Sequence, residues 1–194
     1  MAPDEPPAPG ATDGADDGLR PDRRPFRVQV AALRKANGTV REEHREGPIP
    51  GLGAVAVAVP DEAPVVCDLT LASFPGGIMV TGTVQAPWTG ECRRCGGLVS
   101  GTVAAEVRER YAPETASGGE DEAYPLSGDE IDLEPLARDA VLLDLPLAPL
   151  CQESCQGLCP TCGANRNSEP CDCAPPRDPR WAALDALRDE AEPS

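Results

Sequence analysis

Near its C-terminal end the chain contains the stretch Cys151-Gln-Glu-Ser-Cys155-Gln-Gly-Leu-Cys159-Pro-Thr-Cys162-Gly-Ala-Asn-Arg-Asn-Ser-Glu-Pro-Cys171-Asp-Cys173. Six of the nine cysteines fall within this stretch, and Cys92 and Cys95 form a separate pair upstream. Eight thiols in four close pairs match two four-sulfur zinc sites, with Cys67 left over. A glycine after the second cysteine of two pairs allows the tight turn that brings both thiolates to one ion. The pattern predicts two zinc ions.

The sequence leaves open which pairs share an ion. In a first scheme the last four cysteines of the stretch form one set within a short local loop: Cys159, Cys162, Cys171 and Cys173. The upstream pair and the first two cysteines of the stretch then form the other set: Cys92, Cys95, Cys151 and Cys155. In a competing scheme Cys92 and Cys95 join Cys159 and Cys162 as a zinc ribbon. Closing a short loop costs less chain entropy, which favours the first scheme.

Disulfide bonds and thiol redox chemistry are the alternative uses of these cysteines. The N-terminal sequence Met1-Ala-Pro-Asp-Glu-Pro-Pro has acidic residues where a signal peptide needs basic ones, and no apolar run follows. Cys92-Arg-Arg-Cys95 could act as a redox pair, because adjacent arginines lower a thiol pKa. However, Gly96-Gly97 and a β-like stretch follow it, where a thioredoxin-like motif would open a helix. We therefore expect metal binding and a cytoplasmic location.

Composition sets limits on the core and on the partners. Aromatic residues make up only 3% of the 194 residues, so the core must consist of Val, Leu, Ala and Ile, and bound zinc can supply stability that such a core lacks. A net charge of −16 argues against a general affinity for nucleic acid or anionic membranes. The longest apolar run, about residues 51–59, is too short to span a bilayer. Abundant Ala, Arg, Gly, Pro and Asp with little Lys is typical of a GC-rich bacterium.

The chain divides into four parts. We predict a disordered acidic tail at 1–22, a β-rich body at 23–150, a Cys-rich zinc-binding segment at 151–175 and a C-terminal helix with a tail at 176–194. Strands are predicted at 26–30, 54–59, 65–71, 77–85 and 98–111, followed by an acidic loop at 113–128. Cys92 and Cys95 then lie at the tip of an antiparallel hairpin. The predicted fold class is α+β, an antiparallel sheet or barrel-like body with one core helix.

That core helix is predicted over 132–145. Asp132 can cap it, Pro135 falls in its first turn where no N–H donor is lost, and Pro146 ends it. The helix leads directly into Cys151. Two further residues are expected to pack in the body: Cys67 as a buried thiol and Trp88 at the end of the hairpin.

Basic residues are concentrated at 20–46, a range that contains eight basic and four acidic residues. A phosphate-contacting patch and a solvated surface of scattered charges both fit this pattern. The candidate RNA contacts are Arg23, Arg24, Arg27, Arg34, Lys35, Arg93 and Arg94. Two arginines at a rigid tip suit phosphate binding, and equally suit charge balance for thiolates. His44, the only histidine, is expected to be a solvated surface residue.

The order of these parts resembles a known family. The residues that carry the resemblance are the Cys92/Cys95 knuckle, the helix Asp132-Leu-Glu-Pro-Leu-Ala-Arg-Asp, the motif Gly157-Leu-Cys-Pro-Thr-Cys-Gly163 and Asp178-Pro-Arg-Trp181. Over about residues 26–189 the chain is similar to the YceD family, the large ribosomal RNA subunit accumulation proteins of bacteria and plastids. The resemblance implies a non-enzymatic factor for 23S ribosomal RNA accumulation and large-subunit biogenesis. Its expected partners are precursor RNA, large-subunit ribosomal proteins or assembly factors, without a small-molecule substrate or a membrane.

Comparison within that family bears on the cysteines. Some shorter members keep the first knuckle and a later His/Cys pair but lack the last four cysteines, which favours the first pairing scheme. Arg166 stands where many members have Leu, so we expect a more exposed turn there. No nuclease, methylase or nucleotide-binding motif is present in the sequence. The rival functions are a thiol redox protein or sensor that uses Cys92 and Cys95, and a zinc-stabilised protein–protein adaptor without RNA contact.

Overall fold

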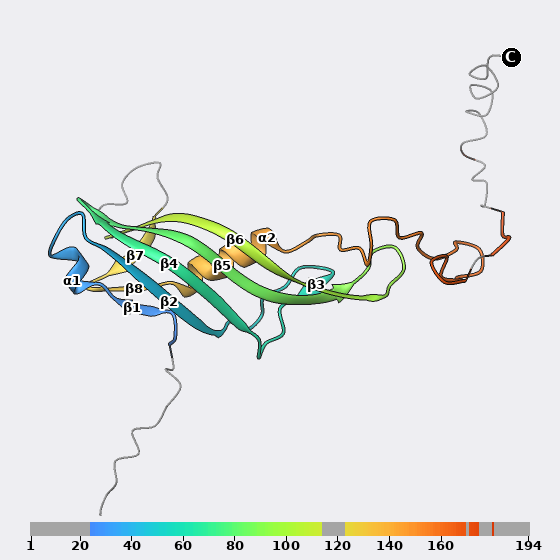
Figure 1. Ribbon diagram of the computed structural model, residues 1–194, viewed down its shortest axis with the longest axis horizontal. Coiled ribbons are helices and arrows are strands. Elements are labelled where there is room, and N and C mark those ends of the chain that lie inside the picture. Colours follow the sequence, from blue (N-terminus) through green and yellow to red (C-terminus); the bar gives the residue numbers. More distant parts are fainter. Residues whose placement is uncertain (1–23, 114–122, 170, 175–179, 181–194) are drawn as a thin grey trace, which may run out of the picture.

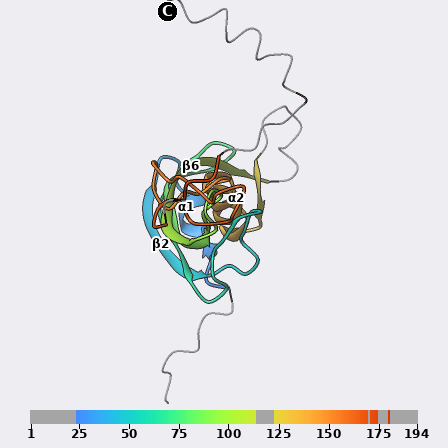
Figure 2. The same ribbon diagram turned by 90° about the vertical axis from the view of Figure 1, so that its right-hand side faces the viewer.

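The computed structural model describes residues 24–113, 123–169, 171–174 and 180. It is mostly β-sheet, curled into a half-barrel (Figure 1). The elements are β1 (Arg27–Gln29), α1 (Ala31–Arg34), β2 (Val40–Pro48), β3 (Val57–Ala58), β4 (Pro64–Phe74), β5 (Gly77–Glu91), β6 (Leu98–Ala112), β7 (Tyr124–Ser127), β8 (Glu130–Asp132) and α2 (Glu134–Asp144). Figure 2, an end-on view, shows the strands curving around the interior with β2 on one side and α2 on the other.

The strand order is β1-β8-β7-β6-β5-β4-β2, with β3 paired to β5. Strands β4, β5 and β6 form a long antiparallel meander, and the β5–β6 register runs from Ile78 opposite Tyr111 to Glu91 opposite Leu98. This hairpin carries the Cys92 knuckle at its tip, which confirms the sequence prediction. On its other side β6 pairs only through Tyr111 and Ala112, in parallel with β7. Over residues 98–109 that edge of β6 has no ladder partner within the described parts of the chain.

The core lies on the concave side of the sheet. Residues of β4 alternate between buried and accessible positions, and Val65, Cys67 and Leu71 are fully buried. Cys67 is therefore a core thiol, as predicted, and burial raises its pKa to about 12. Trp88 packs partly buried against the core. It lies directly opposite Gly101, whose missing side chain leaves room for the indole ring.

Helix α2 corresponds to the predicted core helix, but it begins at Glu134, and its N-cap residue is Leu133 rather than the predicted Asp132, which ends β8. The carboxylate of Asp132 accepts the backbone N–H of Glu134 at 3.0 Å, which satisfies a donor at the start of the helix. Its buried face consists of Leu136, Ala137 and Val141. The helix ends at Asp144, before Pro146. The chain then runs on toward the first cysteine of the C-terminal stretch.

Several predicted elements differ from the structure. The stretch 54–59 forms only the two-residue strand β3, and part of the predicted acidic loop 113–128 forms β7 and continues into β8. Strand β2 was not predicted, because its alternating charged residues present no apolar face to a sequence pattern. The predicted tail at 1–22 and nearly all of the predicted helix at 176–194 lie outside the described residues. Where the chain is described, no helix is long and apolar enough to cross a membrane.

Candidate metal centres

The eight cysteines gather into two groups of four. Within each group the four sulfur atoms all lie within 4.8 Å of one another, and the groups are Cys92, Cys95, Cys151, Cys155 and Cys159, Cys162, Cys171, Cys173. This grouping is the first of the two pairing schemes, and the zinc-ribbon scheme is wrong for this structure. We call the sets the first and the second cysteine group. The first group includes the tip of the β5–β6 hairpin, and the second belongs to the segment that continues beyond it, at the end of the molecule opposite α1 (Figure 1).

The spacing of the sulfurs fits a tetrahedral metal site. The Sγ atoms of Cys92 and Cys155 are 3.8 Å apart, and those of Cys95 and Cys151 are 3.7 Å apart. A tetrahedron with metal–sulfur bonds of about 2.3 Å has edges of about 3.8 Å, whereas a disulfide requires about 2.0 Å between sulfurs. Each group can therefore hold one metal ion, and all nine cysteines are free of disulfides. Four sulfurs in a tetrahedron suit zinc or iron rather than calcium or magnesium.

Two loops with the same hydrogen-bond pattern each supply two sulfur atoms, one loop to the first group and the other loop to the second. In the first, Cys92 donates its N–H to the carbonyl of Gly97 and accepts that of Gly96, both at 2.8 Å. The second repeats this pattern: Cys159 donates to the carbonyl of Ala164 at 2.8 Å and accepts the N–H of Gly163 at 2.9 Å. Gly96 and Gly163 have φ values of 68° and 77°, a left-handed conformation that glycine adopts without strain. The local sequence thus dictates both loops.

Backbone contacts fasten the C-terminal segment to the hairpin tip. Arg93 donates its N–H to the carbonyl of Pro149 at 2.9 Å, and the Arg94 carbonyl accepts the N–H of Leu158 at 3.1 Å. Gly157 makes this approach possible, because a Cβ at that position would lie 2.9 Å from the Arg94 carbonyl oxygen. The hairpin and the segment after α2 therefore complete the first group together. Cys92 and Cys155 of this group are each only 2% exposed.

Asn167, which the sequence reasoning missed, connects the two groups. Its side-chain amide donates to the sulfur of Cys155 at 3.3 Å, and its carbonyl oxygen accepts the N–H of Gln156 at 2.8 Å. Asn165 holds the same amide group from the other side at 2.8 Å. Asn167 itself lies in the loop between Cys162 and Cys171. An N–H donor to a metal-binding thiolate is a common supporting contact, and the two asparagines between Cys162 and Cys171 were the available signal.

Thiol acidity in the first group is uneven. The pKa of Cys92 is lowered to about 6, chiefly by the backbone N–H of Cys151 and also by those of Cys95 and Arg94. The pKa of Cys151 rises to about 12, chiefly because its thiol shares a hydrogen bond with the sulfur of Cys155. Four thiolates this close repel one another, so all four can ionise together only when a cation compensates their charge.

The thiols of the second group also differ in acidity. Backbone N–H groups of Cys162 and Thr161 lower the pKa of Cys159 to about 6. A hydrogen bond with Cys162 is the main reason why the pKa of Cys173 rises to about 12. One sulfur in each group is thus prepared to be a thiolate, and another gives up its proton only to a bound metal ion.

The two arginines at the hairpin tip behave differently. The Arg94 guanidinium turns back and donates to the carbonyl of Cys155 at 2.7 Å and to that of Glu153 at 3.4 Å. Those contacts hold the loop that carries Cys155. Arg93 is exposed on the same loop. Both arginines are therefore at the surface, and the Arg94 guanidinium in addition holds two carbonyl groups of the C-terminal segment.

The other candidate RNA contacts are spread over several elements. Arg27 pairs with Glu130 at 2.6 Å, and Arg34 pairs with Asp129 at 2.9 Å. Arg41 and Arg45 share the carboxylate of Glu43 at 2.8 and 2.6 Å. Arg24 and Lys35 are exposed, and Arg23 lies outside the described residues. Many of the basic side chains at 20–46 thus form ion pairs with nearby carboxylates.

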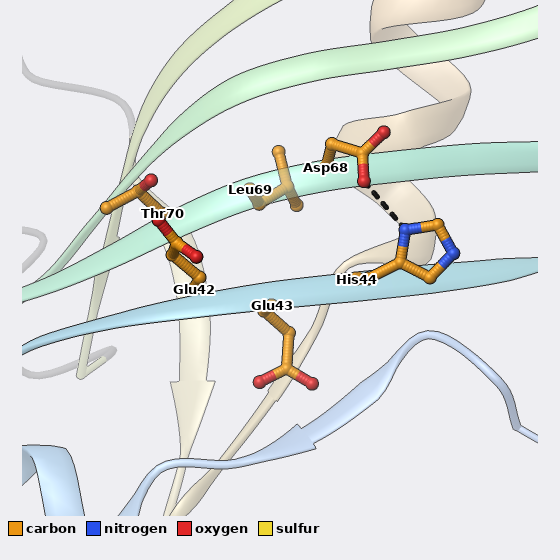
Figure 3. Close-up of a pocket in the computed structure, with 6 residues that line it drawn as sticks. All are labelled: Glu42, Glu43, His44, Asp68, Leu69 and Thr70. Carbon is orange, nitrogen blue, oxygen red and sulfur yellow. Dashed lines mark hydrogen bonds and ion pairs between the residues drawn. The ribbon is translucent and has the colours of Figure 1, made fainter.

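His44 lies on the outer face of the sheet, in an open hollow bordered by β2 and β4 (Figure 3). Its Nδ1 atom is 2.6 Å from Asp68 Oδ1, and both side chains are more than half exposed. The predicted surface position is confirmed. An exposed ion pair of this kind contributes about 0.2–1 kcal/mol to the stability of the fold, and its presence does not indicate a ligand site. Arg166 is also exposed, as expected from its departure from the family pattern.

Comparison with known proteins adds to this geometry. The family model described as "Large ribosomal RNA subunit accumulation protein YceD" matches residues 80–188, a range that contains both cysteine groups. A Mycobacterium tuberculosis protein described as uncharacterized is 39% identical over 165 residues, which are 82% of this chain and 80% of that protein. The chloroplastic YCED homolog 1 of Arabidopsis thaliana is 34% identical over 70 residues, 36% of this chain and 22% of that protein. No solved structure matches the chain significantly.

Proposed function

Because the chain belongs to the YceD family of large ribosomal RNA subunit accumulation proteins, we propose that it is a non-enzymatic, zinc-stabilised factor in 23S ribosomal RNA accumulation and large-subunit biogenesis. The observation that carries this proposal is the location of both cysteine groups inside the matched region. In this proposal the metal ions provide no reaction centre. They fix the segment after α2 onto the hairpin tip.

Zinc is the metal that we propose for both groups. It accepts four thiolates in a tetrahedron, has no redox chemistry of its own and adds folding free energy directly. That energy matters here because the buried core contains few aromatic side chains, chiefly Phe26 and Tyr111. A closed four-sulfur set leaves no open coordination position, which supports a structural role for the ions rather than a catalytic one.

The direct partner in this proposal is precursor RNA, a large-subunit ribosomal protein or another assembly factor. Arg93 is the best-placed candidate for an RNA phosphate contact, because it is exposed at the tip while Arg94 is engaged with two carbonyl groups. A thiol redox role is less well supported, since the most acidic thiol of the first pair, Cys92, is only 2% exposed. The cytoplasmic location expected from the sequence stays a prediction.

Metal analysis combined with thiol titration tests the metal part of the proposal. We expect two zinc ions per chain, no rapidly reacting thiol in the native protein, and eight reactive thiols after chelation. Cys67 should react only after unfolding, because it is buried in the core. Rapid reaction of Cys92 in a metal-loaded protein, or a reversible Cys92–Cys95 disulfide, would instead support the redox role.

A complementation experiment tests the cellular part. Cells depleted of this protein should accumulate less 23S RNA relative to 16S RNA, and the wild-type chain should restore the ratio. A Cys155→Ser variant should fail, and Cys67→Ala, which leaves both groups intact, should succeed. If depletion leaves the RNA ratio unchanged, the proposed role in RNA accumulation is wrong while the metal centres are unaffected.

A further inference from the structure

The second cysteine group comes from one short stretch of chain. Its four cysteines lie between residues 159 and 173, whereas the first group joins the hairpin tip to residues 151 and 155 of the segment after α2. Closing a loop of about 15 residues costs less chain entropy than joining segments that are far apart in the sequence. The second group therefore needs only its own loop to bind an ion, and the first group needs the segment after α2 to be in place.

The loop of residues 163–169, inside the second group, contacts the end of the first group. Arg166 donates its backbone N–H to the carbonyl of Gly157 at 2.9 Å. The Asn167 side chain donates to the sulfur of Cys155 at 3.3 Å and accepts the backbone N–H of the following residue at 2.8 Å. Three consecutive residues of the segment thus each form a hydrogen bond with this loop.

The same part of the segment also contacts the hairpin tip. The Arg94 guanidinium donates to the carbonyl of Cys155 at 2.7 Å, and the Arg94 carbonyl accepts the N–H of Leu158 at 3.1 Å. At Gly157 the two backbones are so close that a Cβ would lie 2.9 Å from that carbonyl oxygen. An unbroken series of contacts therefore runs from the loop of the second group, through this segment, to the hairpin.

An ion in the second group would fix the shape of the 163–169 loop. Cys162 directly precedes this loop and Cys171 follows it closely, so bonds from these two sulfurs to one ion would hold both of its ends. Without an ion, no covalent bond joins the four sulfurs, because all of them are free thiols. The loop then gains conformational freedom, and Asn167 is no longer held against Cys155.

From this arrangement we infer that the two groups bind their metal ions cooperatively: an ion in the second group raises the affinity of the first group, and the hydrogen bond from Asn167 to Cys155 carries the coupling. Cooperative binding rests on the metal sites of the proposed function and adds a coupling between them. Such a coupling is reciprocal, so an ion in the first group raises the affinity of the second group by the same factor. Loss of the second ion also loosens the contact between the segment and the hairpin tip.

Exposure indicates which ion leaves first when metal becomes scarce. The second group has two exposed cysteines, Cys162 and Cys173, and the first group has one, Cys151. The first group has two buried cysteines, Cys92 and Cys155, and the second has one. A chelator or a competing thiol reaches exposed sulfurs more readily than buried ones. The second group is therefore where a change in metal supply acts first, and the coupling passes its effect to the first group.

The test measures cadmium binding to the full chain by competition with a chelator, with cadmium NMR to distinguish the two sites. Cys171→Ser with Cys173→Ser disables the second group and leaves Asn167 and all four cysteines of the first group in place. We expect about tenfold weaker cadmium binding at the first group. Amide hydrogen exchange should become faster at Leu158, whose N–H donates to the hairpin. Asp172→Asn, an exposed change between the same two cysteines, should alter neither measurement.

Asn167→Ala keeps all eight cysteines and tests the coupling independently of the cysteine variant. Because coupling is reciprocal, this change should weaken cadmium binding at both groups of the doubly loaded protein by about the same factor. In protein that already carries Cys171→Ser and Cys173→Ser it should cost little more, because both changes remove the same contact. Slow amide exchange in strand β4 shows that each variant keeps its core folded.

Three outcomes would overturn the inference. Unchanged affinity of the first group in the double-cysteine variant would mean that the two ions bind independently, and the metal centres of the proposed function would be unaffected. A loss confined to the first group in Asn167→Ala would mean that this side chain is a local support and couples nothing. If the full chain bound no cadmium at all, the metal part of the proposed function would fail together with the coupling.

Discussion

The side-chain amide of Asn167 donates a hydrogen bond to the sulfur of Cys155 over 3.3 Å. Asn167 belongs to the loop between Cys162 and Cys171 of the second cysteine group, whereas Cys155 belongs to the first. The two groups thus share a structural contact that neither metal pattern required. A substitution in the loop between Cys162 and Cys171 should therefore affect metal binding by the first group.

Removing this contact should weaken the first metal site. Asn167→Ala deletes the donor to Cys155 and the acceptor for the Gln156 N–H. Loss of such a supporting contact typically lowers metal affinity about 10-fold. Chelator competition followed by cadmium NMR, which distinguishes the two sites, measures the effect. Ser168→Ala, whose hydroxyl reaches only the Asn165 carbonyl, serves as control, and equal losses in both variants would contradict a role for Asn167.

Gly157→Ala should show how much the close contact with the Arg94 carbonyl contributes to stability, apart from the cost of a positive φ. Gly157 and Gly128 have φ values of 71° and 62°, so alanine at either position carries a left-handed penalty of about 1 kcal/mol. Only at Gly157 would the new Cβ meet the Arg94 carbonyl, at 2.9 Å, while nothing lies within 4 Å at Gly128. We expect Gly157→Ala to lower the free energy of unfolding by about 1–3 kcal/mol more than Gly128→Ala, measured by urea titration with zinc present. Equal costs would show that the hairpin contact adds nothing.

Metal binding should release protons and strengthen as pH rises. The pKa of Cys151 and that of Cys173 are raised to about 12, so both thiols are protonated at neutral pH before a metal binds. The pKa of Cys92 and that of Cys159 are lowered to about 6, so these sulfurs are already thiolates there. Calorimetry at pH 7.5 in buffers of different ionisation enthalpy should therefore give more than one but fewer than four protons per ion. Release of all four protons at each site would contradict the lowered values.

Arg93 and Arg94 should have separable roles. Arg93→Glu should reduce the salt dependence of binding to 23S RNA fragments by about one unit of log K against log salt and leave the zinc content unchanged. Arg94→Glu should also weaken metal binding, because the Arg94 guanidinium holds the carbonyls of Glu153 and Cys155. Should RNA binding be indifferent to salt and to both changes, a protein partner would replace RNA in the proposal.

Much of this architecture could be predicted from local sequence. The Cys-x-x-Cys-Gly pattern predicts both loops because their hydrogen bonds join residues only five positions apart, Cys92 with Gly97 and Cys159 with Ala164. Helix α2 could be predicted from its apolar face, the proline in its first turn and the proline after it, whereas its predicted cap residue was wrong. Strand β2 could not, because its pairing with β4, rather than an apolar pattern of its own, makes it a strand.

By itself, the sequence determined the number of metal-binding groups, the knuckle at the hairpin tip, the core helix and the likeness to the YceD family. Only the tertiary structure decided which cysteines lie together, because the β5–β6 register and the contact of Arg93 with Pro149 set the distances between distant sulfurs. It also decided the contact of Asn167 with Cys155. Such relationships join residues far apart in the chain, and no local pattern of residue types encodes the distance between them.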